Sequence, residues 1–532
     1  TAMWNAKTRE QTWADLARPW DVIIIGGGIT GAGILRQAVM AGLRAVLLEA
    51  NDFAFGTSSR SSKLVHGGFR YLRNRQFSVT YESVHERERL LREAPQLVTP
   101  LDFIIPAHKS SPKAAAQYGL GVFIYDIMAP KWAHSYLLPH SLSRICPALS
   151  RKDLIGGYRY QDGLTDDSRL VLRVLREAVS LGGVALNYAK VEGLLTGADG
   201  QVRGAAVRDG LTGQTVEVLG TAVINATGPW ADELRAGVGG EPKLRKSRGS
   251  HIIVPRHRFP ICSAFTLAHP WDSRVLFAIP WEGVTLIGTT DLDHDPELER
   301  TQAEPTITPE EVDYLLAAAT HAFPSLGLTR ADIRSTFAGL RPLVRAGADQ
   351  MPSQVSRASI LLQENGLITI TGGKLTTYRR MGHAALQAIR TRLRPGVHFD
   401  PLKPMFKTPP ALFPEAPISC EMLQSLVGRY GDESLLLLLD ADPAELTQID
   451  ELPLLWAELR WAARQEGVQH LDDLLLRRVR LGLLAEQGGL PHLERIRTLV
   501  QSELGWDDAR WEAEASHYAE VWKSCYYLGV GN

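Results

Sequence analysis

The chain has few cysteines, almost no net charge and no long apolar run. Only four of its 532 residues are cysteines (Cys146, Cys262, Cys420 and Cys525), and they are far apart and form no C-x-x-C pair. This argues against a disulfide framework or a zinc site and fits a reducing compartment. The formal net charge of −1 gives no electrostatic reason to expect nucleic acid as a partner.

Signals for membrane insertion and for bound metals are also missing. No stretch of about 18 uninterrupted apolar residues exists, so we expect no membrane-spanning helix. No secretory signal is visible at the N-terminus. Nothing resembles an iron–sulfur or haem ligand set, and we expect no metal. The composition is that of a globular protein, with 45% hydrophobic and 22% charged residues, and the length predicts two or three domains.

One segment near the N-terminus has the pattern of a dinucleotide-binding unit. Residues 22–25 are apolar and predict a buried parallel strand, which Gly26, Gly28 and Gly31 follow in the order G-x-G-x-x-G. A helical pattern comes next, and then a second apolar strand that ends at Glu49. We expect Gly26 to permit the tight turn, Gly28 to let a pyrophosphate approach the backbone, and Gly31 to let helix and strand pack closely. The helix N-terminus favours the pyrophosphate, and Glu49 can accept hydrogen bonds from a ribose.

Two further segments point to the same cofactor region. Residues 56–71 alternate hydroxyl, basic and glycine residues and start seven residues after Glu49, at the carboxyl edge of the predicted sheet. Residues 225–230 read NATGPW, a strand end of small residues that can press against a flat cofactor. Each is weak evidence alone, since polar surface loops and glycine strand ends are common.

The order of these patterns predicts an α/β fold with three parts. A Rossmann-like nucleotide-binding domain is interleaved with an α+β substrate (cap) domain, and an all-helical C-terminal domain follows a proline-rich linker. In this helical region we expect the leucine run 435–439 to form a buried helix turn. The predicted bounds are 20–106, 165–245 and 340–394 for the nucleotide-binding domain, 107–164 and 246–339 for the cap, 395–418 for the linker, and 419–532 for the helical domain.

Seven motifs, taken together, resemble those of the FAD-dependent, quinone-linked glycerol-3-phosphate dehydrogenases. They keep that family's order and spacing over residues 20–390, whereas the C-terminal region matches less tightly, with DLLLRR at 473–478 where the family has a similar helix. The motifs are IGGGITGAG (25–33), TSSRSSKLVHGGFRY (57–71), NATGPW (225–230), GSHIIVP (249–255), IGTTD (287–291), AGLRPL (338–343) and GGKLTTYR (372–379).

The resemblance implies FAD as the cofactor and gives an expected set of site residues. Cofactor contacts are expected from Gly26, Gly28, Gly31, Glu49, Thr57, Ser58, Ser62, Lys63, Leu64, His66, Gly228, Gly373, Lys374, Leu375 and Thr376. Substrate contacts are expected from Arg70, Tyr71, His251, Arg341, Arg357 and Lys374. Catalytic residues are expected among His66, Arg70, His251, Arg341 and Lys374. Arg357 departs from the pattern, because its neighbours lack the acidic residue that the family often places next.

The residue types agree with the implied reaction, the oxidation of sn-glycerol 3-phosphate to dihydroxyacetone phosphate. Flavin N5 can accept a hydride from C2, so the protein must supply orientation and a base for the hydroxyl proton. A phosphate monoester needs several charge-assisted donors, which Arg70, Arg341, Arg357 and Lys374 can supply. The base stays open among His66, His251 and Lys374. Asp291 is expected to hold a loop or orient the base.

The resemblance also implies electron transfer to a membrane quinone, in the cytoplasm at the inner face of the cell membrane. Residues 109–140 carry apolar and aromatic side chains between lysines, a pattern that suits a helix in a membrane interface or a core helix of the cap. Three alternatives remain: an oxygen-using oxidase of the same substrate, a flavin dehydrogenase or oxidase of another small anionic substrate, and a cofactor-bound scaffold without catalysis. Homodimerisation through the helical domain is left open.

Overall fold

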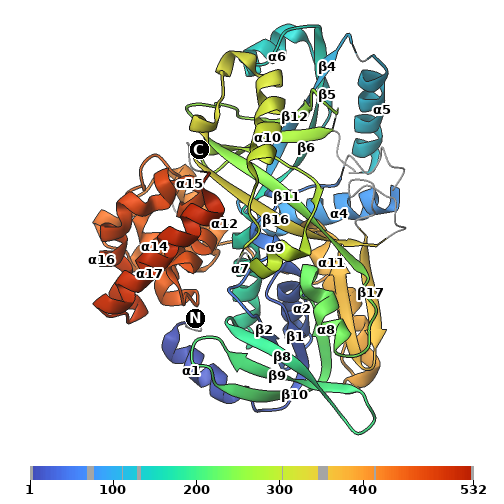
Figure 1. Ribbon diagram of the computed structural model, residues 1–532, viewed down its shortest axis with the longest axis vertical. Helices are drawn as coiled ribbons and strands as arrows, with labels where there is room; N and C mark the ends of the chain where they lie inside the picture. The colour runs from blue at the N-terminus through green and yellow to red at the C-terminus, as the bar shows by residue number, and fades with distance from the viewer. Residues whose placement is uncertain are drawn as a thin grey trace.

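The computed structural model describes residues 4–68, 77–110, 112–128, 133–272, 274–301, 304–345, 358–412 and 415–528. These residues form two β-sheets with helices packed against them and a separate group of C-terminal helices. In Figure 1 the C-terminal helices lie to one side of both sheets, and α5 lies on the opposite side of the molecule. The fold is therefore α/β with an added helical domain.

The first sheet is built around the strand of the glycine motif. Its hydrogen-bonded order is β17-β18-β10-β1-β2-β7; β9 pairs with β10 and β8 with β9. The strands from β18 to β7 are parallel to one another, and β17 is an antiparallel edge. The strands are β1 (Trp20–Ile25), β2 (Ala45–Leu48), β7 (Val184–Leu186), β8 (Ala189–Thr196), β9 (Val202–Asp209), β10 (Thr215–Asn225), β17 (Ser359–Glu364) and β18 (Leu367–Gly372).

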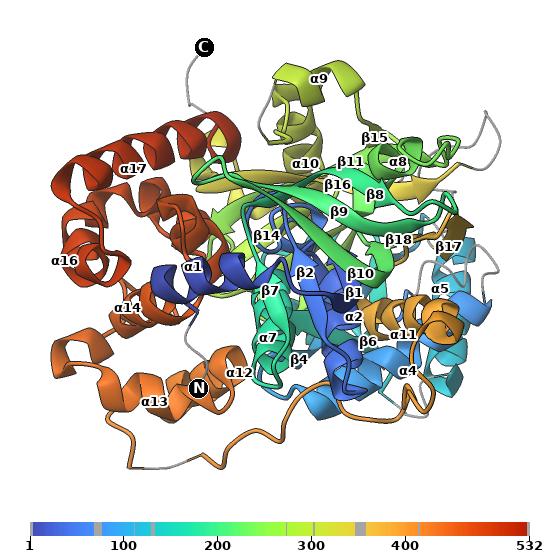
Figure 2. The same ribbon diagram turned by 90° about the horizontal axis from the view of Figure 1, so that it is seen from below.

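Both faces of this sheet are buried, as its continuous apolar strands require. Val22 and Ile24 of β1 pack with helices α2 (Ile29–Met40), α7 (Asp167–Val179) and α11 (Tyr378–Ile389). Ile23 and Ile25 point the other way and pack under β8 and β9. Figure 2 shows these three helices side by side along one face of the sheet. The helix predicted to follow the glycine turn is therefore present as α2.

The second sheet is mostly antiparallel and forms the cap. Its order is β15-β11-β14-β13-β12-β4-β6-β3, with β16 paired to β11 and β5 to β6. The strands are β3 (Leu64–Val65), β4 (Val98–His108), β5 (Ser135–Leu137), β6 (Leu154–Thr165), β11 (Leu244–Pro255), β12 (Ala264–Ala268), β13 (Val275–Trp281), β14 (Val284–Gly288), β15 (Leu292–Asp293) and β16 (Ser335–Val344).

Strands β3, β4 and β16 lie in this second sheet. The predicted bounds instead assign all of β3, most of β4 and the second half of β16 to the nucleotide-binding domain. Val98 of β4 pairs with Thr165, and Phe103 pairs with both Tyr160 and Ala264. An apolar strand pattern indicates that a strand exists but not which sheet it joins. The chain thus crosses between the sheets more often than the predicted bounds allow.

Helices cover the cap and make up the C-terminal domain. Besides α2, α7 and α11, the described residues form α1 (Ala6–Asp15) and α8 (Ala231–Ala236), which pack on the first sheet. The other helices are α4 (Phe77–Glu93), α5 (Pro112–Met128), α6 (Pro139–Ile145), α9 (Pro296–Thr301), α10 (Pro309–Ala322), α12 (Cys420–Tyr430), α13 (Glu433–Asp440), α14 (Trp456–Gln465), α15 (Leu481–Leu484), α16 (Leu493–Leu504) and α17 (Asp508–Val521). The DLLLRR motif forms a π-helical segment, Asp473–Arg478.

One expectation for the C-terminal half needs correction. The leucine run lies in helix α13, but only Leu437 and Leu438 are buried, while Leu435, Leu436 and Leu439 are exposed. Consecutive residues point in different directions around a helix, so five leucines in a row cannot all lie on its buried face.

The predicted linker, residues 395–418, contacts the nucleotide-binding domain. The described residues of 395–418 contain no helix or strand. However, Met405 and Phe406 are buried in the core under the first sheet. The carbonyl oxygen of Met405 accepts a hydrogen bond of 2.8 Å from Arg36 Nε. The linker is therefore packed against the nucleotide-binding domain.

Candidate active site

A cavity of about 1650 Å³ opens at the carboxyl ends of β1, β2, β10 and β18 and extends between the two sheets. We call it the central cavity. The strand-end residues Gly26, Glu49, Ala226 and Gly373 line it, and so does His251 of the second sheet. Typical cavities for a drug-sized ligand have about 300–1,000 Å³. The central cavity therefore has room for a dinucleotide together with a small substrate.

The glycine motif is shaped for close approach, as its sequence predicts. Gly26 has φ +114°, and a Cβ at Gly31 would lie 1.9 Å from the carbonyl oxygen of Gly26. Gly28 is the N-cap of α2 and lines the central cavity together with Ile29 and Thr30, so the N-terminal end of that helix faces the cavity. Gly31 itself packs the helix on the strand and does not line the cavity. The cradle thus fits the pyrophosphate of FAD, and a side chain at either Gly26 or Gly31 would fill or distort it.

Glu49 ends β2 at the cavity wall. Its carboxylate accepts hydrogen bonds from the backbone N–H of Gly27, at 2.6 Å, and of Asn51, at 2.8 Å. Burial raises the pKa of Glu49 above its usual value, although these two N–H groups oppose the rise. The acid is therefore fixed between the glycine turn and the following loop, where a ribose of the cofactor is expected.

The hydroxyl-rich segment lines the cavity beside the glycine turn. Thr57, Ser58, Ser62, Leu64 and His66 all face it. Ser58 Oγ accepts a hydrogen bond of 3.0 Å from the N–H of Ile29 at the start of α2. The structure therefore brings the two sequence motifs together at the helix N-terminus.

Lys63, in the same segment, points elsewhere. It has φ +60°, is fully buried and is not among the residues that line the cavity. Its Nζ donates to Asp167 Oδ1 at 2.8 Å and to the carbonyl oxygen of Ser59 at 2.6 Å. Burial and the nearby Arg480 lower the pKa of Lys63 to about 7, against the opposing effect of Asp167. The side chain thus stabilises the segment on the side that faces away from the cavity.

Arg341 presents a cation at the cavity wall. It lies on β16, and its guanidinium donates to Thr289 Oγ1 at 2.8 Å and to the carbonyl oxygen of Thr290 at 3.3 Å. It also forms an ion pair of 3.2 Å with Asp291, which accepts a hydrogen bond of 2.6 Å from Ser247. Asp291, which is expected to hold a loop or orient the base, thus pairs with the cation Arg341.

His251 is buried in the wall next to Arg341. Its Nε2 lies 2.9 Å from Ser62 Oγ, and its ring stacks on Phe337 with 4.7 Å between ring centroids. Burial, and then the positive charges of Arg341 and Lys63, hold the pKa of His251 well below 6.5. The imidazole is therefore neutral at neutral pH, and its buried Nδ1 has no hydrogen-bond partner within the described part of the chain.

The turn after β18 supplies the opposite wall. Gly373, Lys374, Leu375 and Thr376 line the cavity, and Thr376 Oγ1 donates to the carbonyl oxygen of His66 at 3.2 Å. Lys374 Nζ donates to Ser83 Oγ of α4 at 2.8 Å. Gly228, which has φ +58°, also lines the cavity next to this turn. The residues expected to hold the cofactor and the substrate therefore converge from both sheets.

Three expected substrate residues lie outside the described residues: Arg70, Tyr71 and Arg357. For the others, the structure gives positions but does not test their roles, which stay predictions.

Sequence reasoning missed an apolar arm of the central cavity. The arm is the part of the cavity that is lined by helix α5 and by strands of the second sheet, where the wall residues are mostly apolar or aromatic. These wall residues include Phe103, Ile105, Tyr118, Ile124, Tyr160 and Phe277. The arm joins residues from α5 and three strands that no sequence motif connects. No local signal could have revealed it.

The described ranges contain neither a candidate membrane-spanning helix nor a candidate metal cluster. No helix there is both long and apolar enough to cross a bilayer. No group of three or more His, Cys, Asp or Glu side chains in those ranges is arranged to hold a metal ion.

Comparisons with known proteins give matches over nearly the whole chain. Residues 21–379 match the family model described as FAD dependent oxidoreductase, and residues 382–511 match the C-terminal domain of alpha-glycerophosphate oxidase. Glycerol-3-phosphate dehydrogenase 2 of Mycobacterium tuberculosis is 36% identical over 96% of this chain and 89% of its own length. Glycerol-3-phosphate dehydrogenase of Synechocystis is 34% identical over 94% of this chain and 96% of its own length.

Solved structures agree with these sequence matches. The glycerol-3-phosphate dehydrogenase of Bacillus halodurans complexed with FAD aligns with a TM-score of 0.77, at 29% identity, over 98% of both chains. The L-alpha-glycerophosphate oxidase of Mycoplasma pneumoniae with FAD bound aligns with a TM-score of 0.59 at 17% identity, over 74% of this chain and all of that one, a likeness of fold alone.

Proposed function

The chain belongs to the family of FAD-dependent oxidoreductases that includes the glycerol-3-phosphate dehydrogenases, and from that membership we propose that it oxidises sn-glycerol 3-phosphate to dihydroxyacetone phosphate. It is an enzyme with FAD as cofactor. The observation that carries the substrate proposal is the pair of cations, Arg341 and Lys374, on walls of the central cavity that also hold the cofactor cradle.

These cations suit a phosphate monoester. A phosphate carries nearly two negative charges, and each charge-assisted hydrogen bond contributes about 1.5–3 kcal/mol. Arg341 is fixed by Asp291 and Thr289, so its donors are set before substrate arrives. Holding the phosphate at this end of the cavity would leave the C2 carbon of the substrate facing the cofactor.

The oxidation removes a hydride from C2 and a proton from the C2 hydroxyl. FAD, when bound, supplies the hydride acceptor. The chain must take the proton, and His66, His251 and Lys374 all line the cavity. His251 is neutral at neutral pH, whereas Lys374 must lose a proton before it can act as a base. All three stay candidates for the base.

An anaerobic absorbance titration of the holoenzyme tests the proposal directly. Adding sn-glycerol 3-phosphate should bleach the oxidised flavin band, and dihydroxyacetone phosphate should form in equal amount. Glycerol without phosphate is the matched control, because it carries the same carbon centre but no charge for Arg341 and Lys374. Bleaching by both compounds alike would contradict the phosphate-binding role, and bleaching by neither would reject the substrate.

We further propose a quinone in the membrane as the electron acceptor. The apolar arm of the central cavity supports this, because a quinone ring is flat and apolar and the arm is lined by aromatic side chains. Helix α5 contributes to the wall of the arm, and its side chains Phe123 and Ile127, which do not line the cavity, are exposed to solvent. Exposed apolar side chains of this kind suit a helix lying in a membrane interface, at the inner face of the cell membrane.

Vesicle co-sedimentation tests the membrane part of this proposal. The double variant F123D/I127D should bind anionic phospholipid vesicles less than the wild type does. L181D is the matched control, because Leu181 is also exposed but follows helix α7. Equal binding by all three proteins would contradict a membrane role for α5.

Oxygen is the alternative acceptor, as in a glycerol-3-phosphate oxidase. The C-terminal family match carries an oxidase in its description, which keeps this alternative open. Reoxidation of the reduced enzyme by air-saturated buffer and by a soluble quinone, compared under the same conditions, decides between the two. A faster reaction with oxygen would favour the oxidase.

A further inference from the structure

The cofactor-facing loop has a second side that contacts the C-terminal helical domain. This loop, residues 49–63, joins β2 to β3. Its inner side lines the central cavity through Glu49, Asn51, Phe55 and Ser58, among others. Its outer side carries buried charges that pair with residues more than 400 positions later in the chain. The loop therefore lies between the cofactor and the C-terminal domain.

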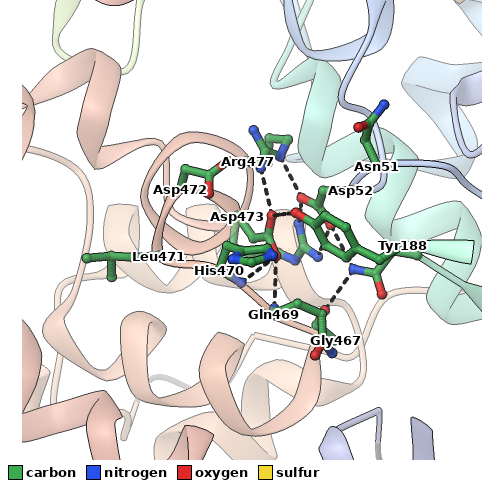
Figure 3. A network of polar contacts seen from close by, with 12 residues as sticks. Asn51, Asp52, Tyr188, Gly467, Gln469, His470, Leu471, Asp472, Asp473 and Arg477 are labelled. Carbon is green, nitrogen blue, oxygen red and sulfur yellow. Dashed lines mark hydrogen bonds and ion pairs between the residues drawn. The ribbon is translucent and has the colours of Figure 1, made fainter. Parts of the chain in front are cut away.

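Asp52 makes the first of these contacts. Its side chain is fully buried, and it accepts hydrogen bonds from two nitrogens of Arg478, at 2.7 and 2.8 Å, and from Arg477 Nε at 2.6 Å. Figure 3 shows Asp52 next to Arg477, with Asp473 and Tyr188 in the same network. Both arginines belong to the C-terminal domain, whereas Asn51, the neighbour of Asp52, lines the cavity.

Arg480 makes the second contact. Its guanidinium donates to the carbonyl oxygen of Ser59 at 2.9 Å and to Asp167 Oδ1 at 3.2 Å. The other oxygen of Asp167 accepts hydrogen bonds from both the backbone N–H and the hydroxyl of Ser61, which lines the cavity. Lys63 completes the cluster through its own pair with Asp167.

A third contact comes from the C-terminal end of the described chain. Tyr526 donates from its hydroxyl to Glu304 at 2.6 Å, and Arg60 donates to both of these groups. The guanidinium of Arg60 lies 4.9 Å from the ring centroid of Phe55. Arg60 and Phe55 both line the central cavity.

These charges leave the loop little freedom while the C-terminal domain is docked. Asp52, Arg477 and Arg478 are all buried, so none of them can exchange its partner for water. Moving the loop would leave a buried charge unpaired, which is strongly unfavourable. Conversely, a cofactor that holds the inner side of the loop would keep Asp52 in place for the two arginines.

We propose that Arg477, Arg478 and Arg480 are positioning residues for the cofactor: through Asp52 and Asp167 they fix loop 49–63 against FAD, so that cofactor binding and docking of the C-terminal domain stabilise each other. None of the three touches the cavity itself. By thermodynamic linkage, if docking of the C-terminal domain raises the FAD affinity by some factor, FAD binding raises the docking equilibrium constant by the same factor.

The chain offers a matched control for a general loosening of the domain interface. Arg176 on α7 forms an ion pair with Glu433 of the C-terminal domain and donates to the carbonyl oxygen of Gln465 at 2.9 Å. It joins the same domain to the same nucleotide-binding unit, through α7. R176Q therefore removes an interdomain contact that does not reach loop 49–63, while other contacts, such as Arg169 with Glu466 and Arg173 with Gly428, keep the domain docked.

FAD affinity of the full-length chain, freed of flavin and titrated by flavin fluorescence, is the first readout. R478Q should raise the FAD dissociation constant by between about 5-fold and about 150-fold, the usual range for coupled sites. R176Q should leave it near the wild-type value. An unchanged affinity in R478Q, or an equal loss in R478Q and R176Q, would overturn the proposal.

Amide hydrogen exchange of segment 473–478 is the second readout and does not depend on R478Q being folded. In the wild type, FAD should slow exchange in this segment. D52N, which keeps the shape of Asp52 but removes its charge, should lose most of that protection. Exchange that does not respond to FAD in the wild type, or an FAD effect of equal size in D52N, would also overturn the proposal. A D52N/R478Q double variant should bind FAD no more weakly than the weaker of the two single variants, because both remove the same contact.

Discussion

Lys374 donates a hydrogen bond from its ammonium group to the hydroxyl of Ser83, 2.8 Å away on helix α4. Ser83 in turn donates to the carbonyl oxygen of Val79 at 2.7 Å. The lysine head is thus aligned by α4, while the backbone of Lys374 belongs to the cavity wall after β18. A cation in this position is oriented before the substrate phosphate arrives.

Replacing Lys374 by alanine should reduce kcat/KM for sn-glycerol 3-phosphate. The loss of one charge-assisted hydrogen bond of about 1.5–3 kcal/mol corresponds to roughly a 10-fold to 150-fold decrease. S83A should cost much less, because the ammonium group keeps its charge and loses only one anchor. Steady-state kinetics on both variants checks this, and unchanged turnover in K374A would remove Lys374 from the active site.

Replacing Gly31 by alanine should abolish FAD retention. The added Cβ would lie 1.9 Å from the carbonyl oxygen of Gly26, so either the helix or the cofactor turn must move. G193A is the control, since a Cβ at Gly193 meets no atom within 4 Å. The flavin-to-protein absorbance ratio after purification is the measurement. We expect a wild-type ratio for G193A and almost no flavin for G31A, and equal ratios would contradict the packing argument.

Replacing Arg341 by alanine should raise KM more than it lowers kcat, because the phosphate is held in both the ground state and the transition state. R341K should recover part of the loss, since lysine keeps the charge but not the guanidinium fork. R345A is the matched control on the same chain segment, where Arg345 Nε donates to the carbonyl oxygen of Leu244 and does not reach the cavity. A KM for R345A that rises as much as that of R341A would argue against a specific phosphate site.

His470 should make the stability of the C-terminal domain depend on pH. Burial alone would lower its pKa, but the hydrogen bond to Glu514, at 3.0 Å, and the charges of Asp473 and Glu514 raise it above 6.5. The folded state therefore favours the protonated form. This contribution is complete below about pH 6.5 and is lost as the pH rises through the raised pKa. Each tenfold gain in proton affinity on folding corresponds to about 1.4 kcal/mol of stability.

Thermal unfolding between pH 6 and pH 8.5 measures this effect. The wild type should lose stability over that interval relative to H470Q, and E514Q should flatten the profile in the same way. A wild-type profile parallel to both variants would show that the pair does not titrate as expected.

Local steric rules explain how much of the site could be predicted from the sequence. The roles of Gly26, Gly28 and Gly31 follow from the turn that G-x-G-x-x-G imposes between a strand and a helix, and the structure has that turn. The position of Glu49 at the cavity wall follows from its place directly after the second strand, Ala45–Leu48. Such features depend on residues that are neighbours in the chain.

Contacts between distant residues could not be predicted. Asp52 and Arg478 are separated by 426 positions, and nothing in either local sequence indicates the other. Lys63 stands inside a cofactor motif, yet its side chain turns away because Asp167 offers a buried partner. Strand β4 joins the second sheet for a similar reason, since its partners come from the cap.

The parallel sheet also determines when this protein can begin to fold during synthesis. Val22 and Ile24 of β1 pair with Ala222 and Ile224, about 200 residues later, and the next neighbour, β18, is made later still. At about 5–20 residues per second, the ribosome needs roughly 10–40 seconds between the first strand and its central partner. During that time β1 can pair with β2 on one edge, but its other edge has no partner from its own chain. The nascent polypeptide is therefore most exposed to aggregation before residue 225 emerges.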